Sequence, residues 1–405
     1  SQKPTILGFV LDLVHGRVSV AEARVLRFLE HLRVLHSKRR PNAKECARLA
    51  GFIISMSFAI GPVARLRTRA LYDMILRRKS WFHRQEWSDE AYAEVSFWWY
   101  CFNEFHGRLV VGDPKITAVV DTWSDASDVA WGGFAVSCGE TIARGNWPEE
   151  VLEAQKSSTW RELRATELVL QSVVQELAGK ECRHRTDNQA AARILQVGSK
   201  VPELQEIACR IFRFCRQNCI RLVPEWVPRE ENVLADFLSK VVDTDDWKLS
   251  SEVFDEIDGL WGPHTVDCFA SAESAQLPRF CSRWWNPGCL AVDAFTMCWE
   301  GENLWLCPPI YLIGDVISRI SVIVSHGTLV VPKWTSAWWW PYLFKGTESS
   351  TLVRSFIFLP RISGLFDSGS CQWNWFDGKV PRCEVMAIRF CSIMGCRCCE
   401  TECRE

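Results

Sequence analysis

Features that mark several protein classes are missing from this sequence of 405 residues. No run of about 18 uninterrupted apolar residues exists, and the opening Ser-Gln-Lys-Pro is not a signal peptide. We therefore expect an intracellular protein, cytoplasmic or nuclear, with no membrane partner. Internal repeats and low-complexity linkers are also missing. Hydrophobic residues at 48% and charged residues at 24% are ordinary for a globular protein, so disorder is not the default expectation.

Paired C-x-x-C spacing is missing as well, although cysteine is abundant at 19 residues. Without that framework, neither a zinc ribbon nor a disulfide scaffold is favoured. We expect residues 376–405 to form a Cys-rich tail with unpaired thiols. The thiols that crowd this end of the chain are Cys391, Cys396, Cys398, Cys399 and Cys403.

Length and charge indicate several domains of unequal character. A chain of this length exceeds one ordinary core, so about two or three domains are expected. The formal net charge of −2 hides an asymmetry, because residues 1–85 carry 17 Lys and Arg against 5 Asp and Glu. Such a basic region can follow a phosphate backbone, since each cation on a phosphate releases a condensed counterion. A solvated helical face explains the charge equally well.

Helical patterns dominate the first region, residues 1–115. The pairs Ser19 with Glu22 and Asn42 with Glu45 have capping-box spacing, and each precedes an apolar stripe of helical period. Ser88 begins another, aromatic-rich helix. The turn-rich segment 111–115 marks the end of this region.

The pattern then changes to a mixed α/β succession over residues 116–243. Short β-branched runs separated by Gly and Ser predict a meander, which a long amphipathic helix follows. We expect strands at 116–123, 130–136, 141–146, 183–186 and 220–227, with helices at 157–178, 188–196, 202–217 and 234–240. Five strands with packed helices describe a mixed sheet, and residues 244–375 continue as a second α/β domain.

Four acidic residues fall where this sheet would bring them together. Asp125 lies at the C-terminal end of the first strand, Glu162 lies near the start of the long helix, Asp187 ends the fourth strand, and Asp236 opens the last helix. Carboxylates are the hard oxygen ligands that Mg²⁺ prefers, and strand ends on one edge make a natural site. Two such ions about 4 Å apart can stabilise the attacking and leaving oxygens of a phosphodiester cleavage.

Asp121 competes with Asp125 for the place of the first ligand. A strand has a side-chain period of two, so both carboxylates lie on one face of the expected strand. The Ala126–Ser127 pair that follows, and the later Gly132–Gly133 pair, favour Asp125.

Four segments around these acids closely resemble the blocks of retroelement type 1 ribonuclease H domains, in order and over about 120 residues. They are Trp123–Ser127 (WSDAS), Trp160–Ala165 (WRELRA), Thr186–Ala190 (TDNQA) and Pro228–Asp236 (PREENVLAD). The resemblance implies that Asp125, Glu162, Asp187 and Asp236 hold two Mg²⁺ ions, with Mn²⁺ as a substitute, and that Asn188 and Asn232 support them. Many family members carry a His before the last Asp; this sequence has none between Asp187 and Asp236, which implies slower turnover.

The first region looks like the thumb and connection of DIRS-type reverse transcriptases. The YxDD motif of the polymerase palm is absent, so we expect no DNA synthesis. A template–primer duplex, an upstream palm and a downstream recombinase are the implied partners. The segments that carry the likeness are Leu7–Phe9, the helix 21–36, Ala50–Ser55, Thr68–Tyr72 and Phe97–Trp99.

Residues 244–375 look like the methyltransferase-like domain of the same elements, which is similar to phage N6-adenine methyltransferases. Active relatives use an Asp, Asn or Ser followed by Pro-Pro and an aromatic residue, which together hold the flipped adenine. Here the motif reads Cys307-Pro-Pro-Ile, and Cys is a poor acceptor, so we do not expect S-adenosylmethionine as a cofactor. The other matching segments are Val266–Ser271, Leu277–Phe280, Asp293–Phe295 and Trp299.

The leading hypothesis is endonucleolytic hydrolysis of the RNA strand of RNA–DNA hybrids by two-metal catalysis. One alternative is an inactive retroelement remnant that only binds nucleic acid. The other is an S-adenosylmethionine-dependent DNA adenine methyltransferase in residues 244–375.

Overall fold

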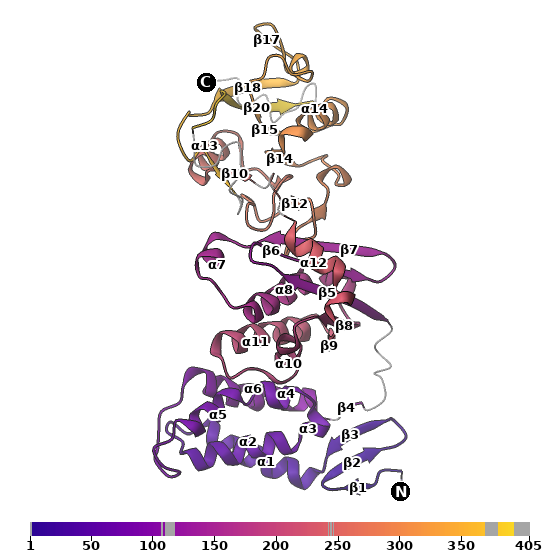
Figure 1. The fold of residues 1–405 in the computed structure, drawn as a ribbon, viewed down its shortest axis with the longest axis vertical. Coiled ribbons are helices and arrows are strands. Elements are labelled where there is room, and N and C mark those ends of the chain that lie inside the picture. Colours follow the sequence, from indigo (N-terminus) through magenta and orange to yellow (C-terminus); the bar gives the residue numbers. More distant parts are fainter. Residues whose placement is uncertain are drawn as a thin grey trace. The chain divides into compact units, whose positions relative to one another are not determined.

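The computed structural model describes residues 2–106, 108–109, 118–241, 243, 245, 247–368 and 380–392, drawn as a ribbon in Figure 1. The expected boundary turn at 111–115 lies outside these residues. Contacts divide the chain into two compact units. The first comprises Ser1–Trp123, Ser157–Glu167 and Gln175–Asn232, and the second comprises Ser124–Lys156, Leu168–Val174 and Val233–Glu405.

The first unit opens with a small antiparallel sheet where the sequence predicted helices. Its strands, in spatial order, are β1 (Thr5–Ile6), β2 (Phe9–Asp12), β3 (Arg17–Val20) and β4 (Arg108–Leu109). Ser19 lies within β3, paired with Val10, so the capping box expected at Ser19 is wrong. The first helix begins after Ala21 without a side-chain cap. The pairing of Arg17 with Leu109 explains the error, because a local pattern does not report so distant a partner.

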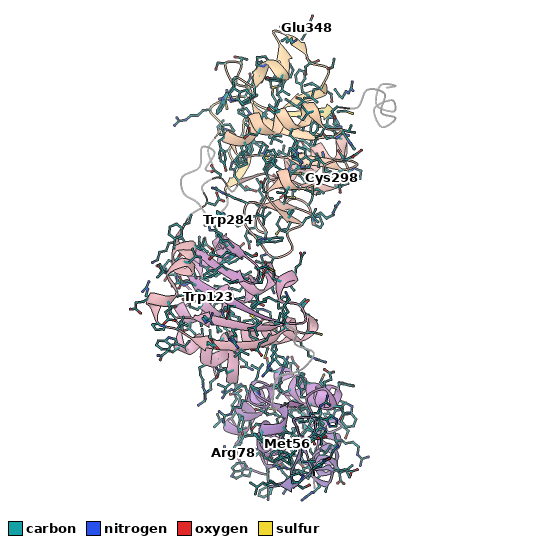
Figure 2. All side chains as sticks on the ribbon, turned by 90° about the vertical axis from the view of Figure 1, so that its right-hand side faces the viewer. Met56, Arg78, Trp123, Trp284, Cys298 and Glu348 are labelled. Atoms are coloured by element: carbon teal, nitrogen blue, oxygen red, sulfur yellow. The ribbon has the colours of Figure 1, made fainter. Side chains whose placement is uncertain are left out.

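Helices make up the rest of this region, and two predicted caps are confirmed. Asn42 and Glu45 form the capping box, and Ser88 accepts a hydrogen bond from the backbone of Ala91. Met56, labelled in Figure 2, is fully buried in the helical core. The helices are α1 (Glu22–His36), α2 (Ala43–Ser55), α3 (Ser57–Ile60), α4 (Val63–Leu66), α5 (Arg69–Leu76) and α6 (Asp89–Phe105).

A five-stranded mixed sheet forms the centre of the chain, as the sequence predicted. Its spatial order is β7 (Glu140–Asn146), β6 (Ala130–Val136), β5 (Val119–Ala126), β8 (Glu181–Thr186) and β9 (Arg221–Trp226). β6 and β7 are antiparallel, whereas β8 is parallel to both β5 and β9. Adjacent parallel strands place their carboxyl ends on one edge, which is where chemistry gathers in such sheets.

The helices of this region follow the predicted order, with one unpredicted helix at 149–153 and one break. The single helix expected at 157–178 is interrupted at residue 173. α10 and α11 pack against β9, and α12 packs against β6. The helices are α7 (Glu149–Glu153), α8 (Ser158–Ser172), α9 (Val174–Leu177), α10 (Gln189–Val197), α11 (Pro202–Gln217) and α12 (Val233–Lys240).

A second five-stranded sheet carries the C-terminal core. Its order is β11 (Val266–Asp267), β14 (Asn303–Leu306), β15 (His326–Pro332), β20 (Val385–Cys391) and β18 (Val353–Phe358). The first three strands are parallel, and β20 is antiparallel to its two neighbours. The helices are α13 (Ser251–Trp261) and α14 (Ile313–Val322). Shorter strands are β10 (Trp247–Leu249), β12 (Cys281–Ser282), β13 (Ala291–Val292), β16 (Phe344–Lys345), β17 (Glu348–Ser349) and β19 (Phe366–Ser368).

The expectation of a Cys-rich tail from residue 376 onward is wrong in part, because β20 lies within that range. This strand lies between β15 and β18, and Cys391 at its end is buried rather than part of a tail. The apolar run Val385–Ile388 is buried in the core of the sheet, which is the physical reason for the difference. Cys383 of the expected tail is half-buried, and Cys396, Cys398, Cys399 and Cys403 lie outside the described residues. In the part of the chain that the structure describes, no helix is both long and apolar enough to cross a membrane.

Candidate functional site

Three of the four expected carboxylates come together at the central sheet. Asp125 lies near the end of β5, Glu162 in the first turns of α8, and Asp187 directly after β8. Each offers one oxygen, and these three oxygens lie within 4.8 Å of one another. Asp125 and Glu162 are buried, and Asp187 is half-buried. This close set of carboxylates, called the carboxylate group below, is the candidate site.

The pairing of β5 with β8 explains why Asp125 and Asp187 meet. The strands are parallel, with Trp123 opposite Arg185. Both acids lie two residues further along their segments, so both project from the same edge of the sheet. Trp226 at the end of β9 donates its indole N–H to the carbonyl of Asp187, 2.9 Å away, which holds the turn after β8.

Asp236, the fourth expected ligand, lies outside the carboxylate group as the structure describes it. It sits in α12, with its Oδ2 2.6 Å from the Nζ of Lys240, one helical turn later. Two opposite charges at i and i+4 form this contact readily on a helix surface. The role of Asp236 as a metal ligand therefore stays a prediction.

Asp121, the rival first ligand, also lies outside the carboxylate group in the described structure. Its Oδ1 is 3.0 Å from Nη2 of Arg185 on the neighbouring strand. The Arg185 guanidinium also lies over the ring of Trp123, 4.6 Å from its centroid. Asp121 thus takes part in an ion pair on the sheet, and geometry favours Asp125.

Ser239 is a residue of this site that the sequence did not indicate. Its hydroxyl donates to Oδ2 of Asp125 at 2.6 Å, and the side chain is fully buried. Short hydrogen bonds to an ionised carboxylate are among the stronger kinds in proteins. The two residues are 114 positions apart. No local pattern reports such a contact.

His184 is fully buried and lies outside the carboxylate group in the described structure. One ring nitrogen is 3.0 Å from the hydroxyl of Thr122, and the other is 3.0 Å from that of Thr166. Burial lowers the pKa of His184 to about 3, so the ring is neutral at physiological pH. Asn188 caps α10 by accepting from the backbone of Ala191, and Asn232 is buried.

The donor chemistry of the carboxylate group fits a hard divalent cation. Oxygen ligands with negative charge suit Mg²⁺ and Mn²⁺, whereas softer metals favour thiolate or imidazole. Three carboxylates this close repel one another, and a cation between them removes that repulsion. Asp125, Glu162 and Asp187 are the residues that would hold it.

Comparison with known proteins gives similarity of structure alone, because no family model and no curated protein matches the sequence. A ribonuclease H1 isolated from compost by a metagenomic approach is 21% identical, with a TM-score of 0.23, over 30% of this chain and 90% of its own. Ribonuclease H1 from Halobacterium salinarum NRC-1 is 20% identical, with a TM-score of 0.23, over 30% of this chain and 94% of its own.

A foamy viral protease-reverse transcriptase, solved in complex with RNA/DNA hybrid, is the third solved structure compared. It is 13% identical, with a TM-score of 0.23, over 60% of this chain and 31% of its own. The chain thus spans less than a third of that protein's length. Likenesses at such TM-scores carry no argument about function.

Proposed function

We propose that the central sheet hydrolyses the RNA strand of RNA–DNA hybrids, as the ribonuclease H of a DIRS-type retroelement reverse transcriptase. The observation that carries this proposal is the convergence of Asp125, Glu162 and Asp187, with one oxygen of each within 4.8 Å. Burial of two of these acids disfavours a decorative role, because like charges are gathered in a buried place only where something offsets their repulsion.

Two divalent cations would supply the electrophilic chemistry, by stabilising charge on the attacking and leaving oxygens and by acidifying bound water. The protein's part is to hold and orient. Asp125 and Glu162 are fixed by burial, and Asp187 by the turn after β8. Asp236 would join them after exchanging Lys240 for a cation. His184 is neutral and hydrogen-bonded within the core, so we assign it no part in proton transfer.

A basic cluster in the helical region supports a nucleic-acid partner. Lys38, Arg39, Arg40 and Arg84 line one hollow of about 380 Å³. Beside it, Arg78 lies over the ring of Trp81 at 4.2 Å, and Lys44 lies over the ring of Phe82 at 4.9 Å. Cations that follow a backbone, with exposed rings that accept stacked bases, are the chemistry of nucleic-acid surfaces.

The decisive experiment follows cleavage of a labelled RNA–DNA hybrid with and without Mg²⁺. The parent should cut the RNA strand when Mg²⁺ is present, and Asp187→Asn should not. Asp121→Asn is the matched control, because it neutralises an acid of the same sheet that lies outside the carboxylate group. This control should cleave like the parent.

Three results would contradict the proposal. A parent that cuts equally well in EDTA would exclude metal-dependent hydrolysis. A parent that binds the hybrid and leaves it intact would establish the alternative, a retroelement remnant that only binds nucleic acid. Cleavage by Asp187→Asn at the parent rate would remove the carboxylate group from the reaction.

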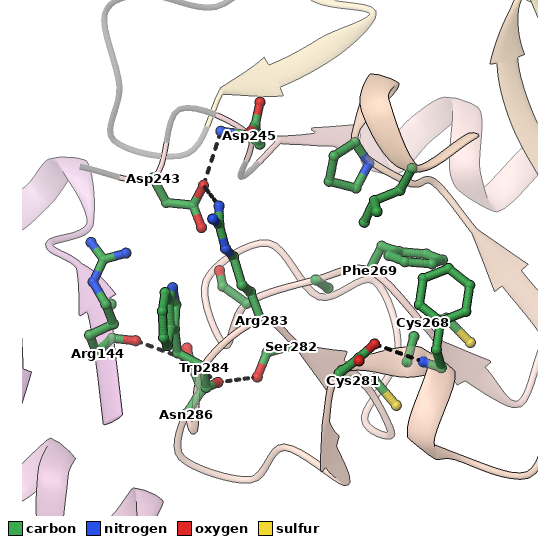
Figure 3. Close-up of a pocket in the computed structure, with 18 of the residues that line it drawn as sticks. Arg144, Asp243, Asp245, Cys268, Phe269, Cys281, Ser282, Arg283, Trp284 and Asn286 are labelled. Atoms are coloured by element: carbon green, nitrogen blue, oxygen red, sulfur yellow. Dashed lines mark hydrogen bonds and ion pairs between the residues drawn. The ribbon is translucent and has the colours of Figure 1, made fainter. Parts of the chain in front are cut away.

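A second candidate function rests on a cavity lined mainly by the C-terminal region, together with residues 144–146 of β7, shown in Figure 3. Its volume is about 350 Å³, and its lining includes Phe269 after β11 and Tyr311 after β14. Arg283 reaches toward Asp243 at its rim, 3.5 Å away. Ligands of α/β sheets bind at the carboxyl ends of the strands, so this cavity suits a small molecule. The activity that such a cavity would serve is DNA adenine methylation with S-adenosylmethionine.

Cys307 weighs against that second function. The residue follows β14 at the place of the adenine-binding acceptor, and it is buried. Burial raises the pKa of the Cys307 thiol well above its usual range, so it stays protonated and accepts weakly. Equilibrium dialysis with labelled S-adenosylmethionine tests the cavity. Binding that Tyr311→Ala weakens, and that the equally exposed Tyr342→Ala does not, would support methylation; no binding by the parent would exclude it.

A further inference from the structure

The last turn of α12 contacts two of the expected metal ligands at once. Ser239 donates to Oδ2 of Asp125, and Lys240 pairs with Oδ2 of Asp236, both at 2.6 Å. Figure 1 shows α12 alongside β6 and β7, and the same helix carries Asp236 itself. One short segment therefore contacts two carboxylates in two ways: Ser239 is a neutral hydrogen-bond donor, and Lys240 supplies a positive charge.

The position of Ser239 is fixed by the turn between β5 and β6. Ser127 in that turn donates its hydroxyl to the carbonyl of Ser239 at 2.5 Å. The carbonyl of Ser127 in turn accepts from the indole of Trp147 at 3.0 Å. Ser239 is thus held through its backbone while its side chain holds Asp125. A carboxylate with one oxygen committed to a donor presents the other in a fixed direction.

Gly132 allows α12 to approach this closely. A Cβ at position 132 would stand 2.6 Å from the backbone carbon of Leu238 and 2.7 Å from the nitrogen of Ser239. No real Cβ makes contacts that short, so a larger residue would push the helix end outward. The last turn of α12 is therefore built against β6, and Ser239 reaches Asp125 because of it.

Lys240 has a different relation to its carboxylate. Its side chain is 55% exposed, whereas that of Asp236 is 22% exposed. An exposed ion pair is weak, because water screens it and two flexible side chains must be ordered. A divalent cation brings twice the charge on a smaller centre. The ammonium group of Lys240 thus pairs with a carboxylate from which a divalent metal ion can displace it.

We propose that the last turn of α12 sets the metal affinity of the carboxylate site in two opposite directions. Ser239 raises the affinity as a positioning residue, because it orients Asp125. Lys240 lowers it, because the ammonium group competes with a divalent cation for Asp236. This inference rests on the proposed function, since it assumes that Asp125 and Asp236 ligate metal.

Mn²⁺ binding to the full chain, followed by electron paramagnetic resonance, tests both halves without measuring activity. Ser239→Ala should weaken Mn²⁺ binding by about tenfold, the lower end of what outer-shell partners contribute. Lys240→Met should tighten the weakest Mn²⁺ site by about threefold to tenfold, and Lys240→Arg should leave it unchanged, because the charge is kept.

Matched controls separate positioning from structural damage. Ser172→Ala removes a buried helical hydroxyl that donates to a backbone carbonyl, that of Leu168, rather than to a carboxylate. Arg77→Met breaks an exposed i,i+4 ion pair with Asp73. Neither control should change Mn²⁺ affinity. The midpoint of urea unfolding is measured for every variant, so a loss of fold is not read as a loss of metal.

The outcomes distinguish this inference from the function on which it rests. A parent that cleaves the hybrid with Mg²⁺, while Ser239→Ala and Lys240→Met bind Mn²⁺ like the parent, overturns the inference alone. A parent that does not cleave, yet shows the two opposite shifts in Mn²⁺ affinity, overturns the proposed function alone. If Ser172→Ala weakens Mn²⁺ binding as much as Ser239→Ala does, the positioning role of Ser239 is also overturned.

Discussion

The central and C-terminal sheets share an arrangement of adjacent parallel strands, but different side chains lie where those strands end. In each, parallel strands end beside one another, β5 with β8 in the first and β11 with β14 in the second. At the first edge three carboxylates converge within 4.8 Å. At the second, aromatic side chains and Arg283 line a cavity of about 350 Å³. The topology creates an open edge, and the side chains decide whether a cation or a small molecule fits there.

Neutralising Glu162 is the strongest test of this difference. We expect Glu162→Gln to lower hybrid cleavage on the order of 10³-fold, or about 4 kcal/mol of transition-state stabilisation. Without metal the variant should be at least as stable as the parent, because one of three mutually repelling charges is gone. Urea unfolding with and without Mg²⁺ measures this, and Mg²⁺ should stabilise the parent alone. A variant destabilised in EDTA would mean that Glu162 serves the fold.

Glu94 tests whether burial alone makes a carboxylate functional. It is buried and accepts hydrogen bonds from the backbone of Ala70 and Leu71 at the start of α5. Desolvation raises the pKa of Glu94 to about 7, from an ordinary value of 4.5. The folded form therefore holds its proton more tightly than the unfolded form. The resulting stability is complete below pH 4.5 and is lost as the pH rises toward 7.

Glu94→Gln should remove that pH dependence. The free energy of unfolding of the parent should lose about 1.4 kcal/mol per pH unit from this group between pH 4.5 and 7. The variant should therefore be destabilised more at pH 5 than at pH 7.5, as urea unfolding at the two values would show. Hybrid cleavage should persist, because Glu94 is remote in sequence and packing from the carboxylate group. Equal destabilisation at both pH values would contradict the raised pKa.

Gly132→Ala sharpens the account of the central edge. Its new Cβ would collide with Leu238 and the nitrogen of Ser239, so we expect a loss of about 1–3 kcal/mol in unfolding free energy. Cleavage should fall as well, since Ser239 moves away from Asp125. Gly139→Ala is the control in the same β6–β7 hairpin, where an added Cβ meets nothing within 4 Å. Similar behaviour of the two variants would show that the approach of α12 is not tight.

The smallest expected effect concerns hybrid binding by the helical region. Arg39→Gln with Arg84→Gln should weaken binding about tenfold and lower the slope of log affinity against log salt by about 2. Fluorescence anisotropy at several salt concentrations measures both quantities. Arg27→Gln with Arg33→Gln removes the same charge from the exposed face of α1 and is the control. Equal losses of hybrid affinity in the two double variants would mean that the basic cluster contributes only through the overall positive charge of the region.

Local patterns predicted the elements whose stabilising contacts are themselves local. The cap at Asn42 and the cap at Ser88 depend on groups three residues away, and both are present. Strand β6 was predicted with the same bounds that it has, because its apolar run is framed by turn residues. The expectation of a tail from residue 376 was wrong for the opposite reason. The short apolar run of β20 forms a strand because β15 and β18 pair with it on either side.

The order of strands and helices around the four acidic residues follows from the sequence, and so does the edge of the sheet at which Asp125 and Asp187 meet. Parallel pairing and a period of two are enough for that. Tertiary packing alone established that Asp121 pairs with Arg185 and that Ser239 holds Asp125. These contacts depend on packing between distant segments, such as α12 against Gly132, and on which charge is nearest after folding.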